Sequence, residues 1–210
     1  MSKFADMSND YLIQNYVPAV YQPSIYSIDY QKLKDAGVRL ISFDIDDTIT
    51  GQENQKPPKE AKTLVEYLKN MGFQVFLLSN ANPERVSQFA DHLGLTGQSV
   101  ARAEKPLSKQ FTVIRNQFGL EANQMAHVGN SQRNDVAGGN AAGVITCLVR
   151  RAGVMTGLHK YIPGYQTEGQ KLRAELEKRG IWRKHHQYEK GDQYYQLGEI
   201  PKYKSEILEK

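Results

Sequence analysis

Between residues 38 and 149, short apolar runs alternate with segments of helical periodicity, and this alternation constrains the fold more than any other feature. The apolar runs predict strands at 38–45, 73–78, 98–102, 125–128 and 144–149. The segments between them predict helices at 57–71, 83–93, 108–118 and 135–142, three of which are ended by Gly72, Gly94 and Gly119. Strands connected through helices are typical of βαβ units. We therefore expect an α/β fold with three layers, in which a central parallel sheet lies between two layers of helices.

The first predicted strand runs directly into three carboxylates, Asp44, Asp46 and Asp47. Ligands of parallel sheets bind beyond the carboxyl ends of the strands, which is where these side chains should lie. Acidic groups after a buried strand are costly unless a cation or a reaction requires them. Asp44 and Asp46, two residues apart, can hold a divalent cation and share nucleophilic and acid–base duty. The alternative is a solvated turn.

Three further polar motifs follow later strands or open helices. Ser79 and Asn80 can bind a phosphoryl oxygen through a hydroxyl and a backbone N–H, or can cap the helix that starts at Pro83. Lys105 can neutralise phosphate charge, or can be an ordinary surface lysine. Asp135 can support a metal, or can cap the helix that follows it. Each motif is weak alone, and the specific signal is their order along the chain.

Together the four motifs resemble those of the haloacid dehalogenase (HAD) superfamily of phosphatases. The run from Asp44 to Thr48 matches the DxDxT motif, and Ser79, Lys105 and Asn130–Asp135 match the second, third and fourth motifs. The chain also looks like the YqeG branch of subfamily IIIA, which is related to phosphatidylglycerophosphate phosphatases. The residues that show this likeness are those from Tyr16-Val17-Pro18 to Ile28-Asp29, Leu33, Gly37, the short motif Lys105-Pro106 and the run from Asp135 to Asn140.

The resemblance implies a phosphatase with an aspartyl-phosphate intermediate. Asp44 would attack phosphorus, and Asp46 would protonate the leaving oxygen and then activate water. Ser79, Asn80 and Lys105 would bind the phosphoryl oxygens, where charge lies in the transition state. Thr48 would stabilise the turn of the first motif.

The resemblance also implies a Mg²⁺ site formed by the Asp44 carboxylate, the Asp46 backbone carbonyl and the 130–135 turn. The family usually has aspartate where this chain has Asn130, so the site loses one negative charge that a hard cation prefers. Asp135 can compensate as a ligand. If it does not, the chain is a HAD-fold binding or scaffold protein with feeble turnover, which is the alternative function.

The spacing of the motifs excludes an inserted cap domain. The intervals from Thr48 to Ser79 and from Ser79 to Lys105 each have room for one helix and one strand. A capless site is open and suits phosphates on large or surface-bound substrates, such as a lipid phosphate. A nucleic-acid end, a phosphoprotein and a small metabolite stay open as alternatives.

The two flanks differ from the middle in composition. Five of the twelve tyrosines lie in the first thirty residues and six after residue 160, and residues 150–190 hold ten Lys or Arg. We expect four parts: a tyrosine-rich segment packing on the core (1–37), the phosphatase core (38–150), a basic extension with a helix from Glu168 to Ile181 (151–184), and a loose polar tail (185–210). The basic flank suits a membrane, RNA or protein interface, or a solvated appendage.

Global properties bound the remaining possibilities. The single cysteine, Cys147, excludes a disulfide scaffold, and no apolar run approaches the length of about 20 residues that a membrane helix needs. The N-terminus lacks the apolar core of a signal peptide, and a net charge of +4 does not argue for nucleic-acid binding. We expect a cytoplasmic protein, with peripheral contact at the inner membrane face left open.

Overall fold

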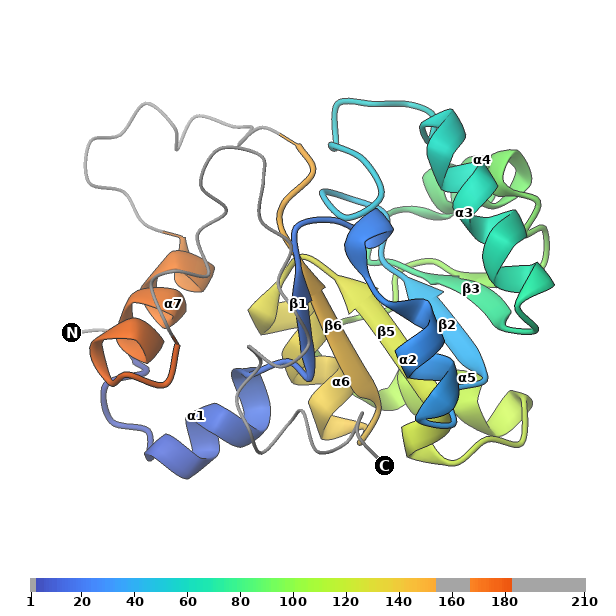
Figure 1. The fold of residues 1–210 in the computed structure, drawn as a ribbon. Helices are drawn as coiled ribbons and strands as arrows, with labels where there is room; N and C mark the ends of the chain where they lie inside the picture. Colours follow the sequence, from blue (N-terminus) through green and yellow to red (C-terminus); the bar gives the residue numbers. More distant parts are fainter. Residues whose placement is uncertain (1–2, 154–166, 183–210) are drawn as a thin grey trace.

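The computed structural model describes residues 3–153 and 167–182. In this part of the chain, strands form one parallel sheet in the order β1-β6-β5-β2-β3-β4 (Figure 1). The strands are β1 (Val20–Gln22), β2 (Leu40–Phe43), β3 (Gln74–Leu78), β4 (Ser99–Val100), β5 (Met125–Gly129) and β6 (Ile145–Val149). All five pairings are parallel, and β2 lies between β3 and β5, with Leu40 opposite Gln74 and Met125.

Helices connect the strands and cover the sheet. The α-helices are α1 (Asn9–Tyr16), α2 (Tyr30–Asp35), α3 (Lys59–Asn70), α4 (Pro83–Leu93), α5 (Lys109–Gln117), α6 (Ala137–Ala141) and α7 (Glu168–Lys178). Short turns of 3₁₀ helix lie at η1 (Ile25–Ser27) and η2 (Ala122–Gln124), and η3 (Gln132–Val136) is a turn of π-helix. Among these residues no helix is both long and apolar enough to cross a membrane.

Different helices pack against the two faces of the sheet, because successive residues of a strand point to opposite sides. Ile41 and Phe43 of β2 belong to a core cluster that also contains buried residues of α2, α3 and α4. Leu40, which directly precedes Ile41 and so points to the opposite face, packs in a second cluster with Phe111 and Ile114 of α5. The three αβα layers that the sequence predicts are therefore confirmed.

The helix boundaries follow the expected signals. The α4 helix begins with Pro83 at its first position, and the side chain of Asn82 caps it by accepting a hydrogen bond from the Arg85 amide at 2.9 Å. It ends at Gly94, whose φ of +68° is the left-handed conformation that glycine adopts most readily. The connections from β2 to β3 and from β3 to β4 each contain one helix and no inserted domain, as the motif spacing predicts.

The tyrosine-rich N-terminal segment contributes a strand that the sequence analysis did not predict. Strand β1 pairs with β6, with Val20 opposite Cys147. A run of three residues is too short to show the period of a strand, so β1 has no recognisable pattern in the sequence.

The α7 helix, predicted within the basic extension, packs on the N-terminal residues and also contacts η3 of the fourth motif, where Arg173 Nε donates to Gln132 Oε1 at 2.7 Å. Leu172 and Leu176 of α7 are buried in one cluster with Phe4 and Leu12. The Arg179 guanidinium donates to the carbonyls of Phe4, Ala5 and Met7 at 3.2, 2.6 and 2.6 Å. The polar tail predicted for residues 185–210 lies outside the described residues.

Candidate active site

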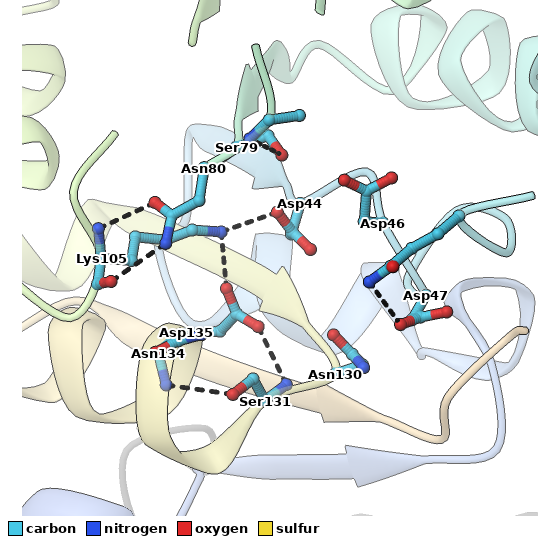
Figure 2. A pocket seen from close by; sticks show the side chains of 12 residues that line it. Asp44, Asp46, Asp47, Ser79, Asn80, Lys105, Asn130, Ser131, Asn134 and Asp135 are labelled. Carbon is cyan, nitrogen blue, oxygen red and sulfur yellow. Dashed lines mark hydrogen bonds and ion pairs between the residues drawn. The ribbon is translucent and has the colours of Figure 1, made fainter. Parts of the chain in front are cut away.

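A pocket of about 350 Å³ opens at the carboxyl ends of β2, β3 and β5 (Figure 2). Strands β3 and β4 lie on one side of β2, and β5 and β6 lie on its other side. Ligands of open α/β sheets bind at such a change in the direction of the strand order. Every residue predicted for the site lines this pocket except Thr48. The lining residues are Asp44, Asp46, Asp47, Gln52, Ser79, Asn80, Ala81, Lys105, Asn130, Ser131, Asn134 and Asp135. The structure thus brings together motifs that are spread over 92 residues of the chain, from Asp44 to Asp135.

Lys105 is the buried centre of the pocket, and its side chain is only 2% exposed. Its Nζ donates to Asp44 Oδ1 at 2.8 Å, to Asp135 Oδ1 at 2.6 Å and to the Leu78 carbonyl at 2.9 Å. Figure 2 shows the lysine reaching between the two carboxylates. Burial lowers the pKa of Lys105, but Asp135 and Asp44 together outweigh burial and raise it. The lysine is therefore charged, and each of its three ammonium protons is donated in one of these hydrogen bonds.

Asp44 follows β2 directly and is almost fully buried. Burial raises the pKa of Asp44, and the charge of Lys105 opposes that rise. Its second oxygen, Oδ2, lies 3.3 Å from Thr48 Oγ1, which is also 3.3 Å from Asn130 Oδ1. One carboxylate oxygen is thus held by the lysine, and the other faces the same hydroxyl as the Asn130 carbonyl.

The side chain of Asn80 is engaged with the backbone of Lys105. Its Nδ2 donates to the Lys105 carbonyl at 3.0 Å, and its Oδ1 accepts from the Lys105 amide at 2.9 Å. This leaves the Asn80 backbone N–H as the group that can face a phosphoryl oxygen. Ser79 Oγ accepts from the Ala81 amide at 3.2 Å, which leaves its hydroxyl proton to donate. Neither residue caps α4, because Asn82 does.

Asp135 is the second carboxylate that binds the Lys105 ammonium group, together with Asp44. Its Oδ1 accepts from Lys105 and lies 3.2 Å from His127 Nε2, and its Oδ2 accepts from the Ser131 amide at 2.9 Å. Burial alone would raise the pKa of Asp135, but Lys105 and His127 hold it well below its usual range. Three of about four acceptor positions on this carboxylate are used, so one is left on Oδ2. Asp135 does not cap the next turn, because the Ser131 hydroxyl does.

His127 is a member of this network that the sequence analysis missed. It lies inside β5 and is 1% exposed, with Nδ1 2.9 Å from Ser42 Oγ. Burial lowers the pKa of His127, so the ring is neutral. We assign its proton to Nε2, because that nitrogen faces the Asp135 carboxylate. In the sequence His127 stands within an apolar strand and carries no signal of a polar partner.

Asp46, the predicted acid–base residue, is bound by Arg85 of α4. The Arg85 Nε and Nη2 both lie 2.8 Å from Asp46 Oδ1, and Nη1 donates to the Asn54 carbonyl at 2.8 Å. Arg85 was not among the predicted site residues, because an arginine in the first turn of a helix resembles any surface arginine in the sequence.

Asp47, to which the sequence analysis gave no role, connects three segments at the pocket rim. It has a φ of +61°, a left-handed conformation that aspartate tolerates better than most residues. Its Oδ2 accepts from Arg151 at 2.7 Å and from Gln52 at 3.1 Å, and its carbonyl accepts from the Ala152 amide at 2.7 Å. Burial raises the pKa of Asp47, and Arg151 opposes that rise.

The donor set of the pocket fits a hard cation held by few protein charges. Asp44 Oδ2 and Asn130 Oδ1 both lie 3.3 Å from the Thr48 hydroxyl, and Asp135, which lines the same pocket, keeps one acceptor position on Oδ2. Within residues 3–153 and 167–182, no group of three or more His, Cys, Asp or Glu is placed to hold a metal ion. Mg²⁺ is commonly bound by one or two carboxylates and several waters, so these oxygen donors suit it without forming a complete protein cage.

Comparison with known proteins identifies the family. The family model of the haloacid dehalogenase-like hydrolases matches residues 7–143. The chain therefore belongs to the haloacid dehalogenase-like hydrolases. Within that family it falls in the YqeG-like branch of phosphatases, since it is 30% identical over 137 residues to the probable phosphatase YqeG of Bacillus subtilis. That match covers 64% of this chain and 77% of the relative.

A second relative is more distant. The chain is 27% identical over 141 residues to phosphatidylglycerophosphate phosphatase 1, chloroplastic, of Chlamydomonas reinhardtii. The match covers 64% of this chain and 52% of the relative, so the chain spans about half of that protein's length. The resemblance drawn from the motifs and the prediction of a phosphatase-type enzyme are confirmed by these matches.

Solved structures with a similar fold include two phosphatases. One is the cobalt-bound deoxy-D-mannose-octulosonate 8-phosphate phosphatase of Haemophilus influenzae, with a TM-score of 0.47, 15% identity, and coverage of 71% of this chain and 92% of that one. The other is the 3-deoxy-D-manno-octulosonate 8-phosphate phosphatase of Moraxella catarrhalis in complex with magnesium, phosphate and KDO. It has a TM-score of 0.45, 14% identity, and coverage of 60% and 85%.

Proposed function

We propose that this chain is a Mg²⁺-dependent phosphatase that hydrolyses a phosphomonoester through an aspartyl-phosphate on Asp44. The observation that carries the proposal is the contact of 2.8 Å between Lys105 Nζ and Asp44 Oδ1 in the pocket at the carboxyl edge of the sheet. A carboxylate next to a fixed cation is suited to attack a phosphoryl group whose charge that cation helps to neutralise.

The reaction follows from the roles of the pocket residues. Asp44 forms a bond to phosphorus as the bond to the leaving oxygen breaks, and Asp46 gives that oxygen a proton. Asp46 then takes a proton from water as the water attacks phosphorus, which breaks the bond to Asp44 and releases inorganic phosphate. Ser79 donates to a non-bridging oxygen during both steps, and the positive charge of Lys105, whose protons go to Asp44, Asp135 and the Leu78 carbonyl, offsets the negative charge of these oxygens.

We infer that Mg²⁺ would be held by the Asp44 carboxylate, the Asp46 backbone carbonyl and Asn130, with Asp135 offering its remaining acceptor position. When bound, the ion would reduce the repulsion between the carboxylate and the phosphoryl group. Because Asn130 is neutral and Asp135 is engaged with Lys105, His127 and Ser131, this proposed site has low charge. The expected affinity for Mg²⁺ is correspondingly weak.

For the substrate, we propose a phosphate on a large or surface-bound molecule, with a lipid phosphate such as phosphatidylglycerophosphate as the first candidate. The absence of an inserted domain between β2 and β4 supports this choice, since none of the residues 3–153 and 167–182 forms a cap over the pocket. The likeness to a phosphatidylglycerophosphate phosphatase also supports it. Arg151 at the rim and the basic residues 151–184 would favour peripheral contact with an anionic membrane.

Asn130 favours a second candidate, a phosphate-binding protein of this fold with feeble turnover. A missing ligand charge weakens metal binding and so weakens catalysis, but it leaves phosphate recognition by Lys105 in place.

The proposal is tested by hydrolysis of p-nitrophenyl phosphate with Mg²⁺ and with EDTA. A panel then compares phosphatidylglycerophosphate in mixed micelles with glycerol 3-phosphate in solution. We expect turnover that requires Mg²⁺ and prefers the lipid. Turnover of the soluble ester alone would refute the substrate class, and turnover of neither ester would favour the binding protein.

A further inference from the structure

Arg85 is fixed more completely than a surface arginine would be. It lies in the first turn of α4, and its side chain is 15% exposed. Two of its nitrogens contact Asp46 Oδ1 and a third donates to the Asn54 carbonyl, as given above. The guanidinium also lies over the Phe89 ring, with Cζ 4.7 Å from the ring centre. One planar group therefore joins α4 to two points, Asp46 and Asn54, of the single loop that connects β2 with α3.

Both contacts with Asp46 fall on the same carboxylate oxygen. Because Arg85 takes Oδ1, the orientation of the carboxylate is fixed while Oδ2 is left for another partner. Asp46 lines the pocket and Arg85 does not, so Arg85 stands behind Asp46 with respect to the phosphate site. An arginine in that place is suited to orienting the aspartate rather than to touching the transferred phosphoryl group.

The contact with Asn54 extends this arrangement to the wall of the pocket. Asn54 lies two residues after Gln52, which lines the pocket and donates to Asp47. The Asn54 side chain also donates to Thr50 Oγ1 at 2.8 Å. The position of Asp46 and the position of this loop are therefore coupled through one guanidinium.

We propose that Arg85 is the positioning residue of the acid–base step, holding Asp46 Oδ1 so that Oδ2 faces the leaving oxygen of the substrate. This inference rests on the proposed function, since it assigns Arg85 to the reaction proposed for Asp46. An acid must lie within hydrogen-bond reach of the atom it protonates, and misplacement by about 1 Å can cost about 100-fold in rate. Arg85 supplies that placement from outside the pocket.

The test is a leaving-group series on Arg85→Gln and Arg85→Lys, with Arg39→Gln as the matched control. Arg39 is an exposed arginine at the opposite end of β2, so its removal changes the net charge but not the site. We would measure kcat and KM for p-nitrophenyl phosphate, phenyl phosphate and an alkyl phosphate with saturating Mg²⁺. Good leaving groups need little protonation, whereas poor ones depend on the acid.

We expect Arg85→Gln to lose about 10-fold more in kcat on the alkyl ester than on the p-nitrophenyl ester, with little change in KM. The loss in kcat for Arg85→Lys should lie between that of Arg85→Gln and that of wild type. Lysine keeps the positive charge but lacks the planar guanidinium group, whose nitrogens contact Asp46 and Asn54 at the same time. In an Asp46→Asn background, Arg85→Gln should cause no further loss. An equal loss across the series, or a full additional loss in that background, would overturn the assignment.

The same data separate this inference from the function on which it rests. A wild type that hydrolyses none of the esters overturns the proposed function and the role of Arg85 with it. A wild type that turns over, with a leaving-group dependence unchanged in Arg85→Gln, overturns the role of Arg85 alone. If Arg85→Gln does not fold by thermal melting, Arg85→Lys decides by the same criterion.

Discussion

Replacing Lys105 with methionine should destabilise the protein in a way that depends on pH. The substitution keeps most of the side-chain volume and removes the charge that lies 2.8 Å from Asp44 and 2.6 Å from Asp135. At an effective dielectric constant of about 20, each contact is worth about 6 kcal/mol before the cost of desolvation. Desolvation cancels much of this, and breaking a buried pair typically costs about 3–5 kcal/mol because a charge is left unpaired.

The pH dependence gives the sign of the effect. Without the lysine, burial and mutual repulsion would raise the pKa values of Asp44 and Asp135 in the folded variant above those of the unfolded chain. A raised pKa stabilises the folded state below the unfolded value, of about 3.9, and that stability is lost as the pH rises through the folded value. The difference in unfolding free energy between wild type and variant should therefore be larger at pH 8 than at pH 5.

The assay is urea unfolding in EDTA at both pH values, with Lys109→Met as the control. Lys109 is an exposed lysine at the start of α5, so its variant should unfold as wild type does. The double variant Lys105→Met/Asp135→Asn should be more stable than Lys105→Met alone, because one unpaired carboxylate is removed. A loss of stability that is the same at both pH values, or a double variant less stable than the single one, would refute this reasoning.

Three further predictions concern other residues of the site. Asn130→Asp should lower the Mg²⁺ concentration for half-maximal activity by about 10-fold or more, whereas an unchanged or raised requirement would mean that Asn130 is not a deficient ligand. Because burial lowers the pKa of His127, wild type should lose stability as the pH falls below about 6.5, and His127→Gln should show a smaller loss in urea unfolding between pH 8 and 5.5. Asp47→Ala should be less stable than Asp47→Asn by about 1 kcal/mol, because alanine tolerates the left-handed φ less well; equal stabilities would show that the backbone there is not strained.

The features that could be predicted from the sequence are those that depend on local pattern. Helix α4 was predictable because Pro83 and Gly94 mark its ends and its apolar residues repeat with helical period. The presence of Asp44 and Ser79 in one pocket was predictable because β2 and β3 are parallel and place their carboxyl ends at one edge of the sheet.

The features that could not be predicted depend on which distant residues become neighbours. Ser42 is 85 residues from His127, and Asp46 is 39 residues from Arg85. Their single-residue contexts, a strand interior and a first helical turn, are the same as those of residues with no special role. The place of Asp47 depends likewise on the segment after β6, which returns to the first motif only in the folded chain.

The central claim, that Asp44 is the nucleophile of a Mg²⁺-dependent phosphatase, is tested most directly by comparing wild type with Asp44→Asn. Both proteins would be incubated with p-nitrophenyl phosphate and Mg²⁺, assayed for turnover, and quenched in acid for mapping of phosphorylated peptides. We predict turnover and phosphate on the peptide that contains Asp44 in wild type, and neither in a variant that remains folded. Turnover of Asp44→Asn near the wild-type rate, or phosphate trapped on a different residue, would contradict the account.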